Sequence, residues 1–334
     1  MRPNVVLVGS MYDAEAEELL EQHAHVTRVD DADREAVLAA LADAHGLVAR
    51  YPARIDRELL AAAPKLLAVL SSGRGVDNID IEAATEAGVV VANNPGLGGK
   101  PVSEHFFGLL LMVTRGLDAI HRHGNEAAWG ASRLGTHRVE LTGKTLGIVG
   151  LGNVGGWTAR RAHGGFLMRV LAYDPYVSAE KMAEVGAIKV ERLEDLLAQA
   201  DFVTAHPEMN DETAHMFNDK SFAQMKAGAY FVNTSRGGVV DTDALVRALR
   251  SGHLAGAALD VYEEEPLPAD HALLGLDNVV LSAHIADFTV ETKRALALNA
   301  ASQLITALGG KQPPSALNPD VWGKVAERRR ALLA

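Results

Sequence analysis

Short apolar runs alternate with longer amphipathic stretches along most of the chain. Apolar runs bounded by turn residues predict buried strands, and stretches with helical periodicity predict helices. In the first hundred residues the expected strands are 4–9, 46–49, 65–70 and 89–92, and the expected helices are 14–22, 55–62 and 81–87. Repeated strand–helix units imply a parallel sheet covered by helices, which binds ligands at the carboxyl ends of its strands.

The alternation continues beyond a turn-rich segment, residues 94–101, which we interpret as a hinge. A long helix over 102–121 is expected to bridge two domains. The later strands are expected at 145–149, 170–174, 202–205, 229–233, 255–259 and 279–282, and the helices at 157–163, 193–200, 220–225 and 242–251. A last helix, from Val290 to about Leu308, is expected to return to the first domain. Residues 311–334 are interpreted as a tail on the surface or reaching a partner subunit.

Composition limits the class of protein. The chain has 334 residues, more than one hydrophobic core usually serves, so two domains are expected. Its net charge of −11 and scattered basic residues argue against nucleic-acid binding. No apolar stretch is long enough for a membrane span, and the N-terminus is typical of a strand, so a cytoplasmic location is expected. The chain has no cysteine, which excludes thiol catalysis, and no metal-ligand spacing, so no metal site is predicted.

One glycine turn carries the strongest chemical signal. The apolar run 145–149 ends directly in Gly150-x-Gly152-x-x-Gly155 and is followed by helix-compatible sequence. In this context the glycines allow a tight turn, the approach of a pyrophosphate and close helix packing. Asp174 closes the next strand, where a carboxylate would accept hydrogen bonds from the adenosine ribose and repel the 2′-phosphate of NADP; the alternative is an aspartate that caps a turn. The sequence therefore favours NAD.

Because this turn lies in mid-chain, the first hundred residues must build a separate domain. We predict an α/β fold with two Rossmann-like or flavodoxin-like domains and parallel sheets. Residues 100–286 would form an NAD-binding Rossmann domain inserted into a substrate domain made of residues 1–99 and 287–334.

Three later strand ends carry reactive side chains: Arg236, Glu265 and His284. Each also has a plain structural reading, as a turn residue, part of a solvated acidic run, and a core histidine. Parallel strands would bring all three to one crevice.

The motifs around these residues resemble those of the D-isomer-specific 2-hydroxyacid dehydrogenases. They are Asn233-Thr-Ser-Arg-Gly237, Leu259-Asp-Val-Tyr-Glu-Glu-Glu-Pro266, Ser282-Ala-His-Ile-Ala286, Gly150-Leu-Gly-Asn-Val-Gly155, Gly75-Val-Asp-Asn-Ile-Asp80 and Asn94-Pro with Val102-Ser-Glu-His105. The resemblance spans residues 40 to 300 or so. It implies transfer of a hydride between NAD and a 2-oxo or 2-hydroxy acid, in an enzyme that forms a homodimer through its nucleotide domains.

The resemblance also implies a role for each site residue. His284 would be the acid–base group, Glu265 would orient it and raise its pKa, and Arg236 would bind the substrate's carbonyl and carboxylate oxygens. The cofactor would contact Gly150, Gly152, Asn153, Val154, Gly155, Asp174, His206, Pro207, Thr213, Thr234, Ser235, Arg236, Asp260, His284 and Ala286. The substrate would contact Arg50, Ser72, Gly73, Arg74, Gly75, Arg236 and His284.

Two first-domain arginines, Arg50 and Arg74, bear on substrate choice. A simple acid needs one cationic anchor, so we expect a second anionic group on the substrate, a carboxylate, phosphate or phosphonate; the alternative is that either arginine turns outward. Asp287 departs from the small residue usual in the family, and it would either raise the pKa of His284 or face solvent. Two other functions stay open: a formate- or phosphite-type dehydrogenase, and an NAD-sensing corepressor-like binding protein.

Overall fold

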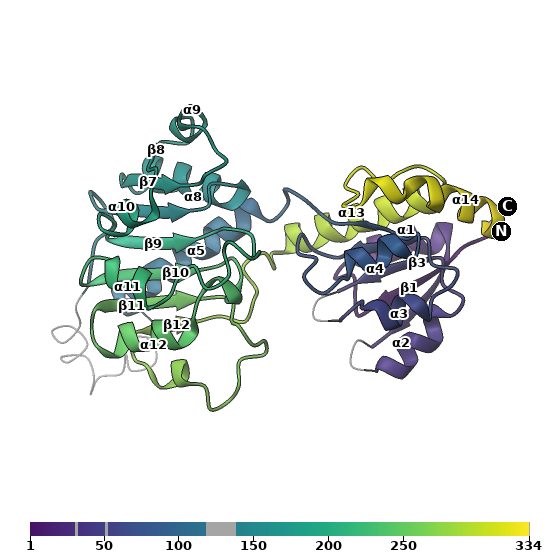
Figure 1. Cartoon of the computed structure of the whole chain (residues 1–334), viewed down its shortest axis with the longest axis horizontal. Coiled ribbons are helices and arrows are strands. Elements are labelled where there is room, and N and C mark those ends of the chain that lie inside the picture. Colours follow the sequence, from purple (N-terminus) through teal and green to yellow (C-terminus); the bar gives the residue numbers. More distant parts are fainter. Residues whose placement is uncertain (31–32, 51–52, 118–137, 334) are drawn as a thin grey trace. The chain divides into compact units, whose positions relative to one another are not determined.

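The computed structural model describes residues 1–30, 33–50, 53–117 and 138–333. The chain divides into two compact units (Figure 1). The first unit comprises Met1–Gly98 and Phe288–Ala334, and the second comprises Gly99–Asp287. Each unit has its own sheet of parallel strands, of five and seven strands in the described residues, which confirms the predicted α/β class.

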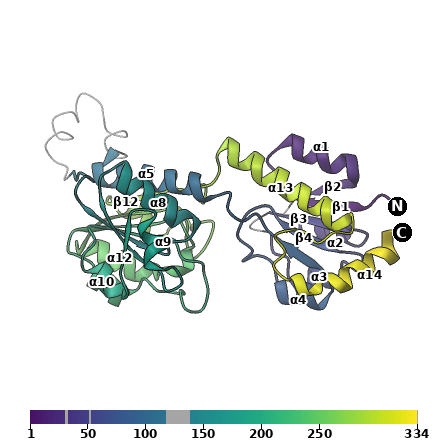
Figure 2. The ribbon, with the colours of Figure 1, turned by 90° about the horizontal axis from the view of Figure 1, so that it is seen from above.

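The first unit contains the sheet β2-β1-β3-β4-β5. Its strands are β1 (Asn4–Val8), β2 (His25–Val29), β3 (Gly46–Ala49), β4 (Ala68–Ser71) and β5 (Val90–Ala92). Helices α1 (Ala14–His23) and α13 (Val290–Leu308) lie side by side (Figure 2). Together with α14 (Trp322–Leu333) they contribute to one apolar cluster, and α2 (Arg34–Leu41), α3 (Arg57–Ala61) and α4 (Ile81–Glu86) contribute to the other. The inner strands are almost wholly apolar because helices cover both faces of the sheet.

Several elements of this unit differ from the predictions. The helix predicted over 55–62 begins at Arg57, because the Asp56 carboxylate accepts a hydrogen bond from the N–H of Leu59 and caps the helix. The strand predicted over 65–70 covers Ala68–Ser71. Strand β2 and helix α2 were not predicted. The strand was missed because it lies at the edge of the sheet, where its residues are polar and mostly exposed and form no apolar run.

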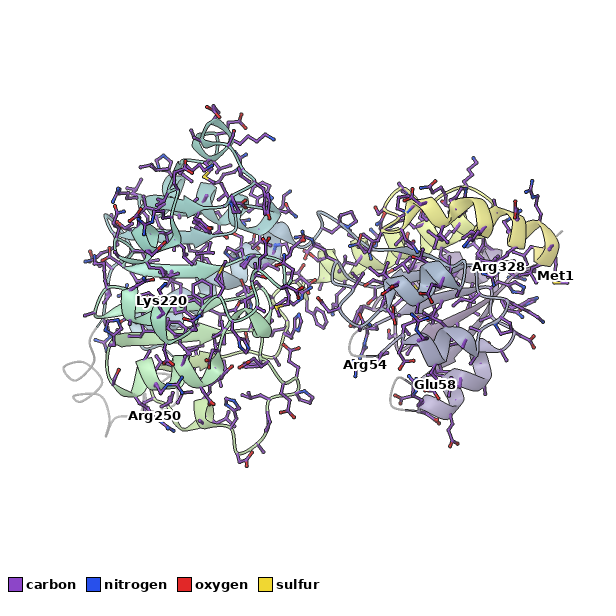
Figure 3. The ribbon with its side chains drawn as sticks, in the orientation of Figure 1. Met1, Arg54, Glu58, Lys220, Arg250 and Arg328 are labelled. Carbon is purple, nitrogen blue, oxygen red and sulfur yellow. The ribbon has the colours of Figure 1, made fainter. Side chains whose placement is uncertain are left out.

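The interpretation of residues 311–334 as a tail is wrong. They form a short 3₁₀ helix, η4 (Pro319–Val321), and α14, and they bury Val321, Val325 and Leu333 in the core of the first unit. Arg328, which Figure 3 labels, belongs to α14. Its guanidinium donates hydrogen bonds to the carbonyl oxygens of Pro64, Ala87 and Gly88. The segment is therefore an integral part of this unit.

The second unit contains the sheet β12-β11-β10-β9-β6-β7-β8. Its strands are β6 (Thr145–Val149), β7 (Arg169–Tyr173), β8 (Ala187–Lys189), β9 (Phe202–Ala205), β10 (Ala229–Asn233), β11 (Leu254–Leu259) and β12 (Val279–Leu281). Helices α5 (Gly99–Arg115) and α8 (Asn153–Gly164) pack on one apolar cluster, and α10 (Leu193–Leu197), α11 (Asp219–Gln224) and α12 (Thr242–Arg250) pack on the other. Helix α9 (Ala179–Ala183) and the 3₁₀ helices η2 (Gly237–Val239) and η3 (Ala272–Gly275) complete the described elements.

Here too some predicted boundaries move. The helix predicted over 102–121 runs from Gly99 to Arg115, and residues 118–121 of that prediction lie outside the described residues. The helix predicted over 157–163 begins at Asn153, and the one predicted over 193–200 ends at Leu197. Helix α9 and strand β8 were missed because both are too short to show a periodicity.

The sheet of the second unit decides where its reactive side chains lie. All its registered strand pairs are parallel, so the loops that follow these strands share one edge. The residues at or just beyond those strand ends are Gly150, Asp174, His206, Arg236, Asp260 and His284. None of the helices in the described ranges has the length and apolar character of a membrane span.

Candidate active site

The glycines of the turn after β6 lie where a side chain would clash with neighbouring backbone or would fill open space. Gly150 has φ +89°, and a Cβ there would lie 2.8 Å from the backbone of His206 and Pro207. A Cβ on Gly155 would lie 2.2 Å from the carbonyl oxygen of Gly150. By contrast, a Cβ on Gly152 would meet nothing within 4 Å, and no side chain caps the start of α8. The first N–H groups of α8, beginning at Asn153 and Val154, thus adjoin an open space that fits a pyrophosphate.

The Asp174 carboxylate is held in place beside this turn. One oxygen accepts a hydrogen bond from the N–H of Leu151 at 2.8 Å, and the other accepts one from the N–H of Tyr176 at 2.9 Å. Each carboxylate oxygen can accept a second bond, so the group retains capacity for ribose hydroxyls.

Two polar atoms near the same edge are buried without a hydrogen-bond partner among the described residues: His206 Nδ1 and Thr234 Oγ1. Burial lowers the pKa of His206 to about 3, so its imidazole is neutral, and its Nε2 lies 3.1 Å from Thr204 Oγ1. Beyond Pro207, the Thr213 hydroxyl donates to the carbonyl of Glu208 and closes that loop. Because buried polar atoms are normally bonded, the two orphaned atoms fit a polar ligand such as NAD.

The side chains of His284 and Glu265 are in direct contact. His284 Nδ1 lies 2.7 Å from Glu265 Oε2, and the other carboxylate oxygen of Glu265 accepts the N–H of Tyr262 at 3.0 Å. The hydrogen bond to Glu265 raises the pKa of His284, although burial and the positive charge of Arg236 oppose it. The His284 side chain is 36% exposed and that of Glu265 only 12%, so the imidazole is accessible and its partner is not.

Arg236 is positioned by the end of β10. Asn233 Oδ1 accepts the N–H and hydroxyl of Ser235, and Asn233 Nδ2 donates to the Arg236 carbonyl. The Arg236 guanidinium donates through Nη1 to the carbonyl of Ser235 at 2.8 Å. Its charge acts on both His284 and Asp287.

Asp260 is hydrogen-bonded to the segment 282–286 that follows β12, and its side chain is only 1% exposed. One carboxylate oxygen accepts the hydroxyl of Ser282 at 2.6 Å and the N–H of Ile285 at 3.0 Å, and the other accepts the N–H of Ala286 at 2.9 Å. Burial alone would raise the pKa of Asp260, but these bonds and the contact with His105 lower it. The contact predicted between Asp260 and the cofactor would therefore involve a carboxylate that already accepts hydrogen bonds from residues 282–286.

Asp287 was predicted either to raise the pKa of His284 or to face solvent. The side chain is half-buried, and burial raises the pKa of its carboxyl, while the charge of His284 acts in the opposite direction. It therefore does not simply face solvent.

In the first unit, the carbonyl groups of Gly73, Arg74 and Gly75 in the loop Ser72–Gly75 accept hydrogen bonds from neighbouring residues. Ser71 Oγ donates to the Gly75 carbonyl at 2.7 Å, Asn93 Nδ2 donates to the Arg74 carbonyl at 2.7 Å, and the Asn94 N–H donates to the Gly73 carbonyl at 3.1 Å. Asn94 is itself held by Asn299 of α13 at 2.6 Å. This loop is thereby prearranged, with the Arg74 side chain exposed.

Arg50 follows β3 at the same edge of the first sheet. Its guanidinium lies 5.2 Å from the centre of the Tyr12 ring, a cation–π contact, and Tyr12 also packs against Phe288 at 5.2 Å between ring centres.

Comparison with known proteins identifies the family. The sequence profile of the D-isomer specific 2-hydroxyacid dehydrogenase NAD-binding domain matches residues 107–286. The chain is 40% identical to a glyoxylate reductase of Thermofilum pendens over 86% of this chain and 85% of the relative. It belongs to the D-isomer-specific 2-hydroxyacid dehydrogenase family.

Two further relatives extend the comparison within this family. A D-3-phosphoglycerate dehydrogenase of Mycobacterium tuberculosis is 39% identical over 94% of this chain, which spans 58% of that relative's length. The holo form of D-mandelate dehydrogenase from Rhodotorula graminis superposes with a TM-score of 0.85 at 28% identity, over 94% of this chain and 97% of that one. The protein is thus an NAD-dependent D-2-hydroxyacid dehydrogenase, as its motifs predicted.

Sequence reasoning missed the residues that support this dehydrogenase site. Tyr262, Ser282 and His105 all lie inside motifs that were recognised, but none of the three was singled out. Their contacts join separate segments of the chain, so no local spacing could reveal them.

Gly237 offers a sharp test of the site's packing. A Cβ there would lie 1.8 Å from the backbone carbon of Tyr262, whereas a Cβ on the neighbouring Gly238 would meet only the end of the Met209 side chain, at 2.9 Å. We expect Gly237→Ala to lower the free energy of unfolding by about 1–3 kcal/mol and to reduce turnover, because the segments after β10 and β11 must move apart. Thermal unfolding and kcat would be measured, with Gly238→Ala as the matched control. Equal behaviour of the two variants would contradict this account.

Proposed function

We propose that this dehydrogenase reduces a 2-oxo acid with His284 as the proton donor, Glu265 as its partner and Arg236 as the substrate anchor. In this proposal the Rossmann unit binds NAD and the first unit supplies the substrate loop. The single observation that carries the proposal is the 2.7 Å contact between an accessible His284 and a nearly buried Glu265, with the Arg236 charge acting on the same imidazole.

The cofactor supplies the hydride in reduction and accepts it in oxidation. The glycine turn and the start of α8 would hold its pyrophosphate, Asp174 its ribose, and the side chains of His206 and Thr234 would face it from the crevice. His284 Nε2 would give a proton to the substrate oxygen as negative charge develops there, and would take it back in oxidation. The negative charge of Glu265 stabilises the imidazolium before that transfer. The planar guanidinium of Arg236 would hold the carboxylate and polarise the carbonyl.

The substrate proposal is that the acid carries a second anionic group. Arg50, fixed over Tyr12, and the exposed Arg74 on the prearranged loop are the cations that support it. The names of the relatives cover both cases, since 3-phosphoglycerate carries such a group and glyoxylate does not. A homodimer and a cytoplasmic location stay predictions.

Replacement of His284 tests the assignment directly. We expect His284→Ala to lower kcat for reduction of 2-oxo acids by at least about 10²-fold, because general acid catalysis is lost. NADH binding, followed by its fluorescence, should stay nearly unchanged. Turnover within tenfold of the wild type would refute the role of His284.

The pH profile tests the partner. Because Glu265 raises the pKa of His284, the proton needed for reduction is retained to higher pH, and kcat/KM for reduction should fall as pH rises through that raised pKa. Removing the charge in Glu265→Gln should move this fall to lower pH by roughly one unit or more. Glu264→Gln, which alters the exposed neighbour, is the control and should keep the wild-type profile. An unshifted profile for Glu265→Gln would overturn the pairing.

Arginine substitutions test the substrate class. Arg50→Ala and Arg74→Ala should each lower kcat/KM for phosphorylated or dicarboxylic 2-oxo acids by about 10- to 100-fold, the size expected for a lost charged hydrogen bond. Glyoxylate reduction should change little, and Arg54→Ala, at an exposed arginine of the same unit, should change neither. Equal losses on every substrate would sink the second-anion proposal while leaving the reaction class intact.

A further inference from the structure

A second histidine reaches the catalytic loop from a different part of the Rossmann unit. His105 lies on α5, and its Nε2 is 2.9 Å from Ser282 Oγ and 3.4 Å from Asp260 Oδ1. Its side chain is 24% exposed. Neither the family's catalytic residues nor the cofactor contacts proposed above include it.

The direction of the hydrogen bonds follows from the number of protons. Ser282 has one hydroxyl proton and donates it to Asp260 Oδ1 at 2.6 Å. Ser282 Oγ can then only accept from His105, so His105 Nε2 carries a proton. The chain of donors therefore runs from His105 through Ser282 to the Asp260 carboxylate.

Asp260 in turn fixes the backbone around His284. The Asp260 carbonyl accepts the His284 N–H at 2.7 Å, and its carboxylate accepts the N–H groups of the next two residues. His284 itself has φ +51°, a left-handed conformation that residues other than glycine rarely adopt. Such a conformation persists where surrounding contacts impose it, and here these contacts all converge on Asp260.

We propose that His105 is a positioning residue for His284, acting through Ser282 and Asp260. This inference rests on the proposed function of His284 as the proton donor. The Nε2–H of His105 orients the Ser282 hydroxyl toward Asp260, and the carboxylate so held keeps the loop 284–286 in the conformation that presents the imidazole. Helix α5 thereby contributes to catalysis without touching substrate or cofactor.

The test compares two substitutions of the same residue. His105→Leu removes the donor and should lower kcat by about 10- to 100-fold, the usual cost of losing a residue that orients a reactive group. The dissociation constant of NADH should change much less than kcat, because most of the predicted cofactor contacts lie outside Asp260 and the loop 284–286. His105→Gln places an amide N–H at similar reach and should recover most of kcat.

The control is a histidine elsewhere in the same unit. His253 Nε2 lies 3.0 Å from the Phe222 carbonyl and is similarly part-buried, so His253→Leu loses a comparable contact without affecting the loop after β12. It should keep wild-type kcat. Ser282→Ala breaks the same hydrogen-bonded chain at its middle and should lower kcat much more than it changes NADH affinity.

The outcomes separate this inference from the proposed function. If His284→Ala is inactive while His105→Leu keeps kcat within twofold of wild type, the positioning role is wrong and the proposed function stands. If His284→Ala remains active, the proposed function itself fails. Equal losses in His105→Leu and His105→Gln would also overturn the inference. If His105→Leu fails to fold, Ser282→Ala decides the question. A wild-type kcat in Ser282→Ala would overturn the positioning role of His105, and a lowered kcat in Ser282→Ala together with an active His105→Gln would support it.

Discussion

The arrangement of the candidate site in the second unit depends on the hydrogen bonds that the buried carboxylate of Asp260 accepts. A carboxylate with 1% exposure must be surrounded by donors, because an uncompensated charge inside a protein is costly. The donors that meet this requirement come from the loop after β12 and from α5. The hydrogen bonds that stabilise this charge therefore connect the end of β11 to the loop that carries His284 and to helix α5.

Around that carboxylate the parallel sheet supplies the geometry. Parallel strands end at one edge, so side chains more than a hundred residues apart in sequence, such as Asp174 and His284, project from the same side of one sheet. Two glycines then allow loops from neighbouring strands to touch, Gly150 against His206 and Gly237 against Tyr262. Any side chain at these positions would push the loops apart.

In the first unit, hydrogen bonds between neutral groups hold a loop in place in a similar way. Its loop Ser72–Gly75 satisfies its carbonyl oxygens through Ser71, Asn93 and Asn94, and α13 secures Asn94 through Asn299. The chain's last helix completes that core, with Val325 fully buried. A loop ordered in advance in this way spends less conformational entropy when it binds a ligand.

The sequence alone determined the α/β class, the two parallel sheets and NAD as the cofactor, because apolar runs and the spacing of Gly150, Gly152, Gly155 and Asp174 are local properties. It also predicted Arg236, Glu265 and His284 as a group, since each follows a strand. It did not reveal β2, whose edge position leaves polar residues exposed. It also did not reveal α14, because the few apolar residues of this helix form no clear pattern and only the folded structure shows that they pack on the core. Only the tertiary structure decided that His105, Ser282 and Asp260 form one hydrogen-bonded chain, because hydrogen bonds between distant segments depend on where folding brings them and leave no periodicity in the sequence.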